Sequence, residues 1–268
     1  MKTLLCLHKG ANQRNHRVSR FQVGAALLLV ILTGCSTAPR HEHIEKGLDI
    51  YLLIGQSNMA GRTQFGELED EPSPNILLFN DSDEWEPAAH PLNRYSTIRK
   101  PEIEQLLGPG YAFAKNMVTE DPDQPIGLVV NARGGTSIRQ WKRGSLLFNE
   151  TVKRTRAAMK QGTLRGVLWL QGGSDKNATR GYLRRLIAFI AHLRASLDMP
   201  NLPFVAGQIK GAPLINEHIA KLPRKVKNAG FVSSDGLTTF DLWQVHFDSQ
   251  SMMLLGERFA KEMRRVQR

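Results

Sequence analysis

Two residues far apart in the sequence, Ser57 and His246, carry the side chains that acyl transfer requires. A serine hydroxyl becomes a strong nucleophile when an imidazole takes its proton. Ser57 directly follows a short apolar run that predicts a strand, and open parallel sheets bind ligands at the carboxyl ends of their strands. Serines commonly cap helices at such positions, and on position alone capping is the favoured role for Ser57.

Among the eight histidines of the chain, His246 is the best candidate for a general base. Four others stand within the first 43 residues, ahead of the predicted folded part. His192 lies in a predicted amphipathic helix, and His90 and His218 lie in polar stretches where a surface position is expected. His246 stands just before the predicted last helix, and the family resemblance described below is what distinguishes it from the other three.

A charged acyl oxygen would need hydrogen-bond donors near the nucleophile. The pair Gly134-Gly135 allows the backbone to approach a substrate closely, and Gln171 offers a side-chain amide. Glycine pairs also mark turns, and a glutamine can simply satisfy local backbone groups, so a structural role stays open for each. Trp141 could stack on a sugar ring or pack in the core.

These residues are spread over an alternating pattern of apolar runs and amphipathic stretches that predicts an α/β fold. Nearly continuous apolar runs favour a parallel sheet covered on both faces, within a single domain over residues 48–268. The predicted strands are Asp49–Ile54, Asn75–Phe79, Ile126–Asn131, Gly166–Leu170, Phe204–Ile209 and Gly230–Ser233. The predicted helices are Tyr111–Met117, Leu146–Met159, Tyr182–Leu197 and Ser249–Val266, the last with Asp248 as N-cap and a core-facing stripe of Met252, Leu255, Phe259 and Met263.

Composition excludes several classes of protein. With 41% hydrophobic and 23% charged residues over 268 positions, the chain is not disordered. Its net charge is 36 − 25 = +11, but five of the cations lie in the first 34 residues, and the remaining excess of 31 − 25 = +6 is scattered, so a nucleic-acid partner is not indicated. Both cysteines lie within the first 35 residues, and no dinucleotide fingerprint or phosphate loop is present. We therefore expect no metal and no organic cofactor.

The N-terminus has the features of a signal peptide. A basic stretch ending at Arg20 precedes the apolar run Val23–Leu32, which is about half the ~20 residues needed to cross a bilayer. Leu32-Thr-Gly-Cys35 resembles the lipobox of bacterial lipoproteins, which implies removal of residues 1–34 and lipidation of Cys35. Residues 35–47 are expected to form a polar tether, in which two histidines are too few and too flexible for a metal site. We expect a membrane partner through this anchor, on the periplasmic side of the cell envelope, with the outer membrane favoured because Ser36 follows the cysteine.

The segment from Tyr51 to Arg62, with Gly-Gln-Ser-Asn-Met-Ala-Gly-Arg, resembles the nucleophile block of a known hydrolase family. The family is the sialate O-acetylesterase-like branch of the SGNH hydrolases, which includes carbohydrate esterase family 6. Residues 108–114, 132–138, 168–175 and 245–248 resemble its further blocks in the same order, so the resemblance spans residues 49–268.

The resemblance implies a flavodoxin-like three-layer fold and a role for each candidate residue. Ser57 would be the nucleophile and His246 the base. The oxyanion donors would be the Ser57 amide, Gly134, Gly135 and Gln171, and the residues expected to contact substrate are Gln56, Asn58 and Trp141.

Two carboxylates of the family pattern are replaced, by Gly173 after Gln-Gly and by Trp243 three residues before the histidine. An acid that orients the imidazole is worth about 10⁴ in rate in well-studied proteases. Asp241 could supply it if the loop carries two extra residues; Asp175 and Asp248 are alternatives, and a backbone carbonyl would leave a slower Ser-His dyad.

The sequence thus predicts a lipid-anchored serine esterase that removes acetyl groups from a carbohydrate through an acyl-enzyme on Ser57. The replaced carboxylates motivate an alternative, a catalytically degenerate relative that binds glycans without cleaving them. A purely structural envelope lipoprotein explains the anchor but leaves Ser57 and His246 without a purpose.

Overall fold

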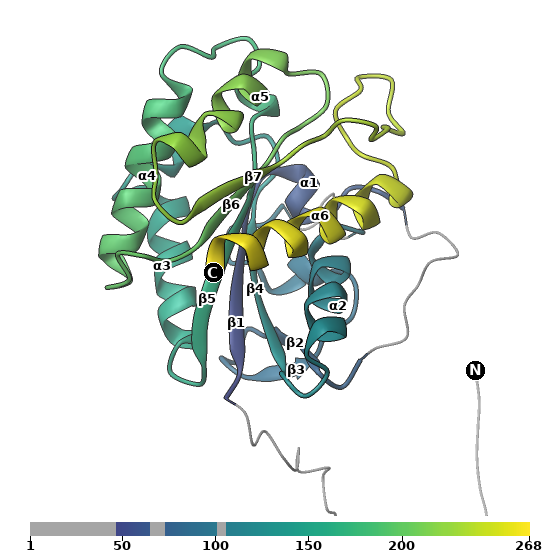
Figure 1. Ribbon diagram of the computed structural model, residues 1–268, viewed down its shortest axis with the longest axis vertical. Coiled ribbons are helices and arrows are strands. Elements are labelled where there is room, and N and C mark those ends of the chain that lie inside the picture. Colours follow the sequence, from purple (N-terminus) through teal and green to yellow (C-terminus); the bar gives the residue numbers. More distant parts are fainter. Residues whose placement is uncertain (1–46, 65–72, 101–105) are drawn as a thin grey trace, which may run out of the picture. The chain divides into compact units, whose positions relative to one another are not determined.

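The strands assemble into one seven-stranded sheet with the order β3-β2-β4-β1-β5-β6-β7 (Figure 1). All neighbouring strands are parallel except β2 and β3. The strands are β1 (Asp49–Gly55), β2 (Ile76–Phe79), β3 (Trp85–Pro87), β4 (Ile126–Ala132), β5 (Thr163–Leu170), β6 (Phe204–Gly207) and β7 (Ala229–Val232).

This computed structural model describes residues 47–64, 73–100 and 106–268. Cys35, the predicted signal segment and nearly all of the predicted tether lie outside these residues. No helix within the described ranges combines the length and the apolar character that a membrane span needs.

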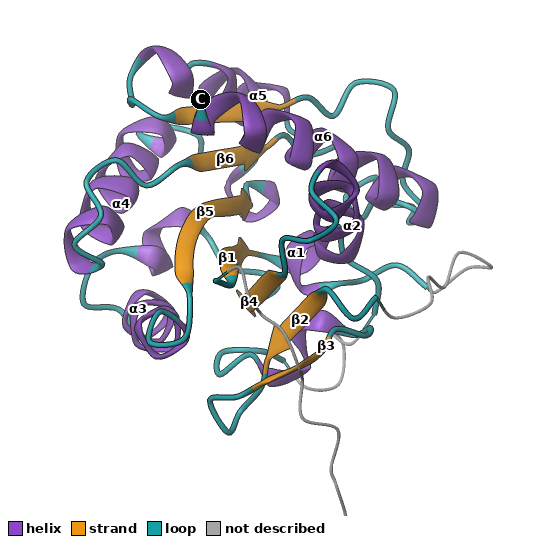
Figure 2. Cartoon of the chain, turned by 60° about the horizontal axis from the view of Figure 1, so that its bottom comes forward, coloured by secondary structure: helices purple, strands orange, loops and turns teal. Residues whose placement is uncertain are grey.

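Helices cover both faces of the sheet and give three layers (Figure 2). Helices α2 and α6 pack against each other on one face, and α3 and α4 lie on the other. The helices are α1 (Ser57–Ala60), α2 (Gly110–Glu120), α3 (Leu146–Ala158), α4 (Tyr182–Ser196), α5 (Pro213–Ala220) and α6 (Ser249–Gln267). The predicted α/β class with a central parallel sheet covered on both faces is confirmed.

Three elements were not anticipated by the apolar pattern. β3 is only three residues long and pairs antiparallel with β2 at the sheet edge, so the sheet is mostly rather than wholly parallel. The edge position accommodates Pro87, which lacks the N–H that a central strand would need. The short helices α1 and α5 follow the carboxyl ends of β1 and β6 and are not among the predicted helices.

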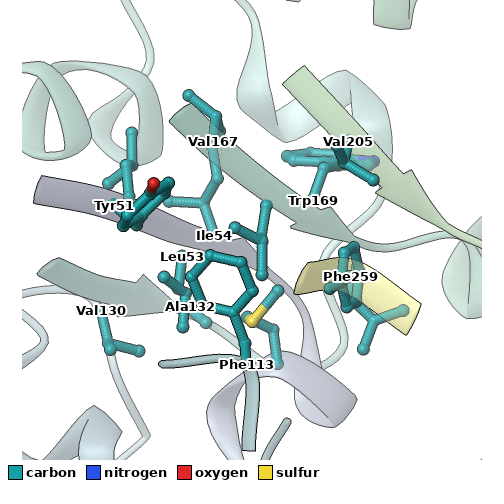
Figure 3. Packing of buried hydrophobic residues seen from close by; sticks show 14 of the residues in the cluster. Tyr51, Leu53, Ile54, Phe113, Val130, Ala132, Val167, Trp169, Val205 and Phe259 are labelled. Carbon is teal, nitrogen blue, oxygen red and sulfur yellow. The ribbon is translucent and has the colours of Figure 1, made fainter. Parts of the chain in front are cut away.

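The central strand β1 is buried on both faces, which explains its unbroken apolar run. On one face the Tyr51 ring meets Phe113 of α2 edge-on, with centroids 4.9 Å apart (Figure 3). On the other face of the sheet Trp169 of β5 packs against Phe189 of α4, 5.0 Å between centroids. This packing fixes β1 between the two helical layers.

The last helix begins and packs as its sequence predicts. Asp248 is the N-cap, and its Oδ1 accepts the Ser251 N–H over 2.8 Å. The Thr238 hydroxyl also donates to the Asp248 carboxylate. The predicted stripe of Met252, Leu255, Phe259 and Met263 is fully buried. The start of α6 is therefore held firmly just after His246.

The parallel register places the carboxyl ends of β4, β1 and β5 side by side. Gly55, the last residue of β1, pairs with Ala132 of β4 on one side and Leu170 of β5 on the other. Gly55 has φ +143°, and a Cβ there would lie 2.2 Å from the Leu170 carbonyl oxygen. Only glycine permits this close approach, which sets the course of the chain into Ser57.

We expect Gly55→Ala to lower the free energy of unfolding by on the order of 3 kcal/mol, because backbone strain and a clash with Leu170 add. Gly236 is the matched control: its φ is +74°, and a Cβ there would meet nothing within 4 Å. Gly236→Ala should cost about 1 kcal/mol, from strain alone. Urea denaturation measures both free energies of unfolding. Equal losses in the two variants would show that the close contact between Gly55 and Leu170 does not add to the strain.

Candidate active site

Ser57, His246 and Asp241 form one continuous chain of hydrogen bonds. The Ser57 Oγ lies 2.9 Å from His246 Nε2, and His246 Nδ1 lies 2.7 Å from Asp241 Oδ2. Ser57 is 6% exposed, and the side chains of His246 and Asp241 are 19% and 13% exposed. Each nitrogen of the ring thus has one partner, a hydroxyl on one side and a carboxylate on the other.

The acid and the base share one compact segment, Thr239–Phe247, which we call the histidine loop. A β-bridge between Thr239 and Phe247 closes it, and the Phe240 N–H donates to the His246 carbonyl over 3.1 Å. Inside the loop, Asp241 Oδ1 accepts the N–H groups of Val245 and His246 over 2.8 and 3.1 Å. Asp241 therefore organises the backbone that carries His246 as well as contacting its ring.

The surroundings of Asp241 favour its charged form. Partial burial by itself would raise the pKa of the carboxyl group. The hydrogen bonds from the Val245 and His246 backbone, together with the contact to the His246 ring, outweigh that effect and hold the pKa below its usual value. The carboxylate is ionised at neutral pH.

The other acids considered from sequence do not reach His246. Asp248 caps α6, as expected. Asp175 is buried, and its Oδ2 accepts the Ile138 N–H over 2.8 Å. Trp243 is 81% exposed in the turn between Asp241 and His246. Of the acids considered, Asp241 is the one that lies beside the imidazole.

Asn58 fastens the histidine loop to the nucleophile segment. Its Nδ2 donates to the Val245 carbonyl over 2.9 Å, and its Oδ1 accepts the Phe247 N–H over 3.3 Å. These contacts hold the backbone on both sides of His246, and Asn58 is 1% exposed. The expected substrate contact is replaced by a positioning contact, because the side chain faces the loop rather than solvent.

Gln56 is likewise engaged with the protein. Its Oε1 accepts the N–H groups of Gly172 and Ser174 over 3.2 and 3.4 Å, which ties the serine segment to the turn after β5. A Cβ at Gly173 would lie 2.9 Å from Gln56 Nε2. The Gln56 amide therefore lies close to the backbone at Gly173.

The expectation that Gln171 is an oxyanion donor is not supported by the geometry. Gln171 has no exposed surface, and its Nε2 donates to the Thr136 carbonyl over 2.9 Å and to Asp175 Oδ2 over 2.6 Å. Its Oε1 accepts the Tyr182 hydroxyl over 3.0 Å. Because both amide hydrogens have internal partners, Gln171 fastens the Thr136 backbone instead.

Trp141 also has a structural place rather than the expected substrate contact. It is fully buried, and its Nε1 donates to Thr136 Oγ1 over 3.1 Å. Its ring packs edge-on against Trp169, 5.2 Å between centroids. A ring without exposed surface cannot stack on a sugar, so the core interpretation of Trp141 holds.

Gly134 and Gly135 follow β4, whose end lies beside the end of β1. Gly135 is exposed and has φ +72°, while Gly134 is buried. Thr136, directly after the pair, is held through its carbonyl by Gln171. The turn is thus anchored next to Ser57 at an edge where its backbone can approach a ligand.

Sequence reasoning missed one neighbour of the imidazole. The Phe240 ring stacks against the His246 ring, with centroids 6.1 Å apart and planes 26° apart. Its position next to Asp241 was the available signal.

Within the described part of the chain, no group of three or more His, Cys, Asp or Glu side chains is placed to hold a metal ion.

The lowered pKa of Asp241 predicts a specific dependence of stability on pH. Because folding lowers this pKa from 3.8, the carboxylate stabilises the native state above that pH, and the stabilisation is lost as the pH falls through and below it. We expect the difference in unfolding free energy between wild type and Asp241→Asn to be largest near neutral pH and to shrink below about pH 4. Urea titrations across this range measure it, and a difference that is independent of pH would contradict the interpretation.

Comparison with known proteins identifies the family. A family model described as carbohydrate esterase, sialic acid-specific acetylesterase, matches residues 47–265. A curated relative from Arabidopsis thaliana, described as a probable carbohydrate esterase, is 33% identical over 237 residues, which cover 79% of this chain and 88% of the relative.

Solved structures share the fold. An Arabidopsis thaliana protein matches with a TM-score of 0.73 and 30% identity, over 82% of this chain and 99% of the other. NanS matches with a TM-score of 0.68 and 18% identity, over 82% and 97% of the two chains. A carbohydrate acetylesterase from Xanthomonas citri matches with a TM-score of 0.61 and 20% identity, over 81% and 56%. The extent of the family match and the identity to the plant relative show that this chain belongs to the carbohydrate esterase, sialic acid-specific acetylesterase family.

Proposed function

We propose that this protein is a carbohydrate O-acetylesterase that works through an acyl-enzyme on Ser57. The observation that carries the proposal is the continuous chain from the Ser57 hydroxyl through His246 to Asp241. Membership of a carbohydrate esterase family supports the acetyl ester of a sugar as the substrate class. The side chains needed for acyl transfer are all present, so the proposal requires no metal or organic cofactor.

In the first half-reaction, His246 Nε2 takes the proton of the Ser57 hydroxyl as Oγ attacks the carbonyl carbon of the ester. The carbonyl π electrons move to the oxygen and form a tetrahedral intermediate. Its collapse breaks the bond to the sugar oxygen, which receives the proton from His246. In the second half-reaction water attacks the acetyl-serine, with the same ring as base, and acetate and the free serine are released.

Asp241 supports each proton transfer. Its carboxylate accepts a hydrogen bond from His246 Nδ1–H, which keeps the proton on Nδ1 and leaves Nε2 free to act as base toward Ser57. The low pKa of Asp241 keeps the negative charge that stabilises the imidazolium formed during the reaction. The two backbone N–H groups held by Asp241 limit motion of the ring relative to the carboxylate.

The oxyanion would be stabilised by backbone donors. The Ser57 N–H stands at the start of α1, and the turn of Gly134 and Gly135 lies beside it at the ends of adjacent strands. Backbone donors fixed before the reaction cost no reorganisation as charge develops. Gln171 contributes indirectly, because it holds the Thr136 carbonyl that follows the glycine pair.

The position of Asp241 favours an enzyme over the alternative of a degenerate glycan-binding protein. The alternative rested on two replaced carboxylates, and one of them, at Trp243, has a substitute in Asp241 that reaches the imidazole. At the other, Gly173, a Cβ would lie 2.9 Å from Gln56 Nε2, so the Gln56 amide lies next to this position. An orienting acid that had no chemical task would not need to contact the ring nitrogen opposite Ser57.

Ser57→Ala should abolish hydrolysis of acetylated sugars, because it removes the hydroxyl that His246 Nε2 contacts. Asp241→Asn should lower kcat by about 10³- to 10⁴-fold, since the amide no longer stabilises the imidazolium. Asp235→Asn, an exposed carboxylate ahead of the histidine loop, is the control and should retain wild-type kcat. Acetate release measures all three, and unchanged turnover in Ser57→Ala would remove Ser57 from the mechanism.

We further propose that Cys35 carries a lipid anchor on the periplasmic side of the bacterial envelope. The proposal rests on the lipobox-like Leu32-Thr-Gly-Cys35 after a basic and then apolar segment. Expressed in a bacterium fed labelled palmitate, the wild-type chain should incorporate label and Cys35→Ser should not. Incorporation into Cys35→Ser would refute the anchor.

A further inference from the structure

Three of the exposed large apolar side chains stand in four consecutive residues of the histidine loop. Phe240 is 52% exposed, Leu242 fully exposed and Trp243 81% exposed. In the described part of the chain, the remaining side chains of this kind are Leu146, Leu214 and Leu254, which lie apart in sequence. A gathering of exposed apolar surface on one loop indicates a binding surface more than scattered single residues do.

The position of this surface relative to the catalytic groups is fixed by the loop. Asp241 lies between Phe240 and Leu242, and its carbonyl accepts the Gln244 N–H over 3.0 Å to form a turn. Trp243 is three residues from His246, so their Cα atoms can be no more than about 11 Å apart. The hydrogen bonds of Asp241 to Val245 and His246 hold that turn against the catalytic ring.

Phe240 lies directly beside the imidazole of His246. Its ring stacks on His246 and remains half exposed, so one part of the ring contacts the imidazole while another part contacts solvent. In the proposed mechanism His246 Nε2 returns its proton to the departing sugar oxygen. The sugar ring must therefore lie close to His246 when the ester is at Ser57. Phe240 contacts the His246 ring, and Trp243 precedes His246 by three residues in the same loop.

We infer that Phe240 and Trp243 form an aromatic platform that binds the apolar face of the sugar ring carrying the acetyl group. The inference rests on the proposed esterase function and specifies how that site selects its substrate. A pyranose ring presents C–H groups on its faces, and aromatic faces carry a partial negative charge that attracts them. The platform selects an ester on a sugar ring over the same ester on a small flexible alcohol.

A membrane surface is the other occupant that an exposed indole suggests, and the loop disfavours it. Insertion of Trp243 into lipid would carry the ionised Asp241 and the polar turn around it toward the hydrocarbon region. Moving a carboxylate and backbone polar groups there is costly. The same groups stay hydrated when a sugar ring rests on the exposed aromatic side chains of the loop.

The test compares two neutral acetyl esters in the full-length protein, glucose pentaacetate and glycerol triacetate. The first carries acetyl groups on a pyranose ring, and the second has no ring. Aromatic leaving groups such as 4-nitrophenol are avoided, because they could themselves stack on Trp243. Trp243→Ala removes the indole, Trp243→Phe keeps an aromatic face, and Trp243→Leu keeps only apolar bulk.

We expect Trp243→Ala and Trp243→Leu to raise KM for glucose pentaacetate by roughly fivefold, which corresponds to the loss of about 1 kcal/mol of aromatic contact. Their kcat and their kinetics on glycerol triacetate should stay within twofold of wild type, and Trp243→Phe should recover most of the affinity. Leu254→Ala, an exposed apolar residue on α6, is the matched control and should change neither substrate. Equal effects of Trp243→Ala on both esters would overturn the platform.

A binding measurement separates this inference from the proposed function. Calorimetry on Ser57→Ala, with and without Trp243→Ala, reports glucose pentaacetate affinity without turnover, and equal affinities would overturn the platform even if catalysis is confirmed. Conversely, hydrolysis by Ser57→Ala would refute the esterase mechanism but leave the affinity difference interpretable. Reduced sedimentation of Trp243→Ala with phosphatidylglycerol vesicles, with unchanged KM, would assign the loop to a membrane instead.

Discussion

The contact between the Ser57 hydroxyl and the His246 imidazole is the constraint on which the rest of the site depends, because it joins segments 189 residues apart. Neither partner is held by the other alone. Gly55 lets β1 run close to Leu170 of β5, and Ser57 therefore lies at the carboxyl ends of the central strands. The Asn58 amide holds the backbone on both sides of His246, and α6 begins directly after the loop at the N-cap Asp248.

Asp241 combines structure and chemistry in one side chain. One oxygen accepts two backbone N–H groups of its own loop, and the other faces the ring of His246. The orientation of the imidazole, the charge of the carboxylate and the shape of the loop are thus coupled. This coupling explains how Asp241, five residues before His246, reaches the ring, since the loop is built around its carboxylate.

The fold and the two central site residues were predictable because their signals are local or lie in specific motifs. Apolar runs with turn residues between them located the six longer strands, and Ser57 and His246 stand in motifs at the ends of elements. The roles of Gln171 and Trp141 were not predictable, because a motif position does not reveal whether a side chain points toward the crevice or the core. β3 and α5 were missed because three residues with a proline, or one short helix, carry little periodic signal. The partner of His246 depended on the conformation of a loop, which sequence spacing alone leaves open.

The central claim is that Ser57 is activated by His246. A fluorophosphonate reagent, which phosphonylates a serine only when its hydroxyl is activated as a nucleophile, tests this claim directly when the modified peptide is located by mass spectrometry. We expect stoichiometric modification of Ser57 in the wild-type protein and its loss in His246→Ala. Modification of another residue, or equal labelling of Ser57 without the imidazole, would contradict it.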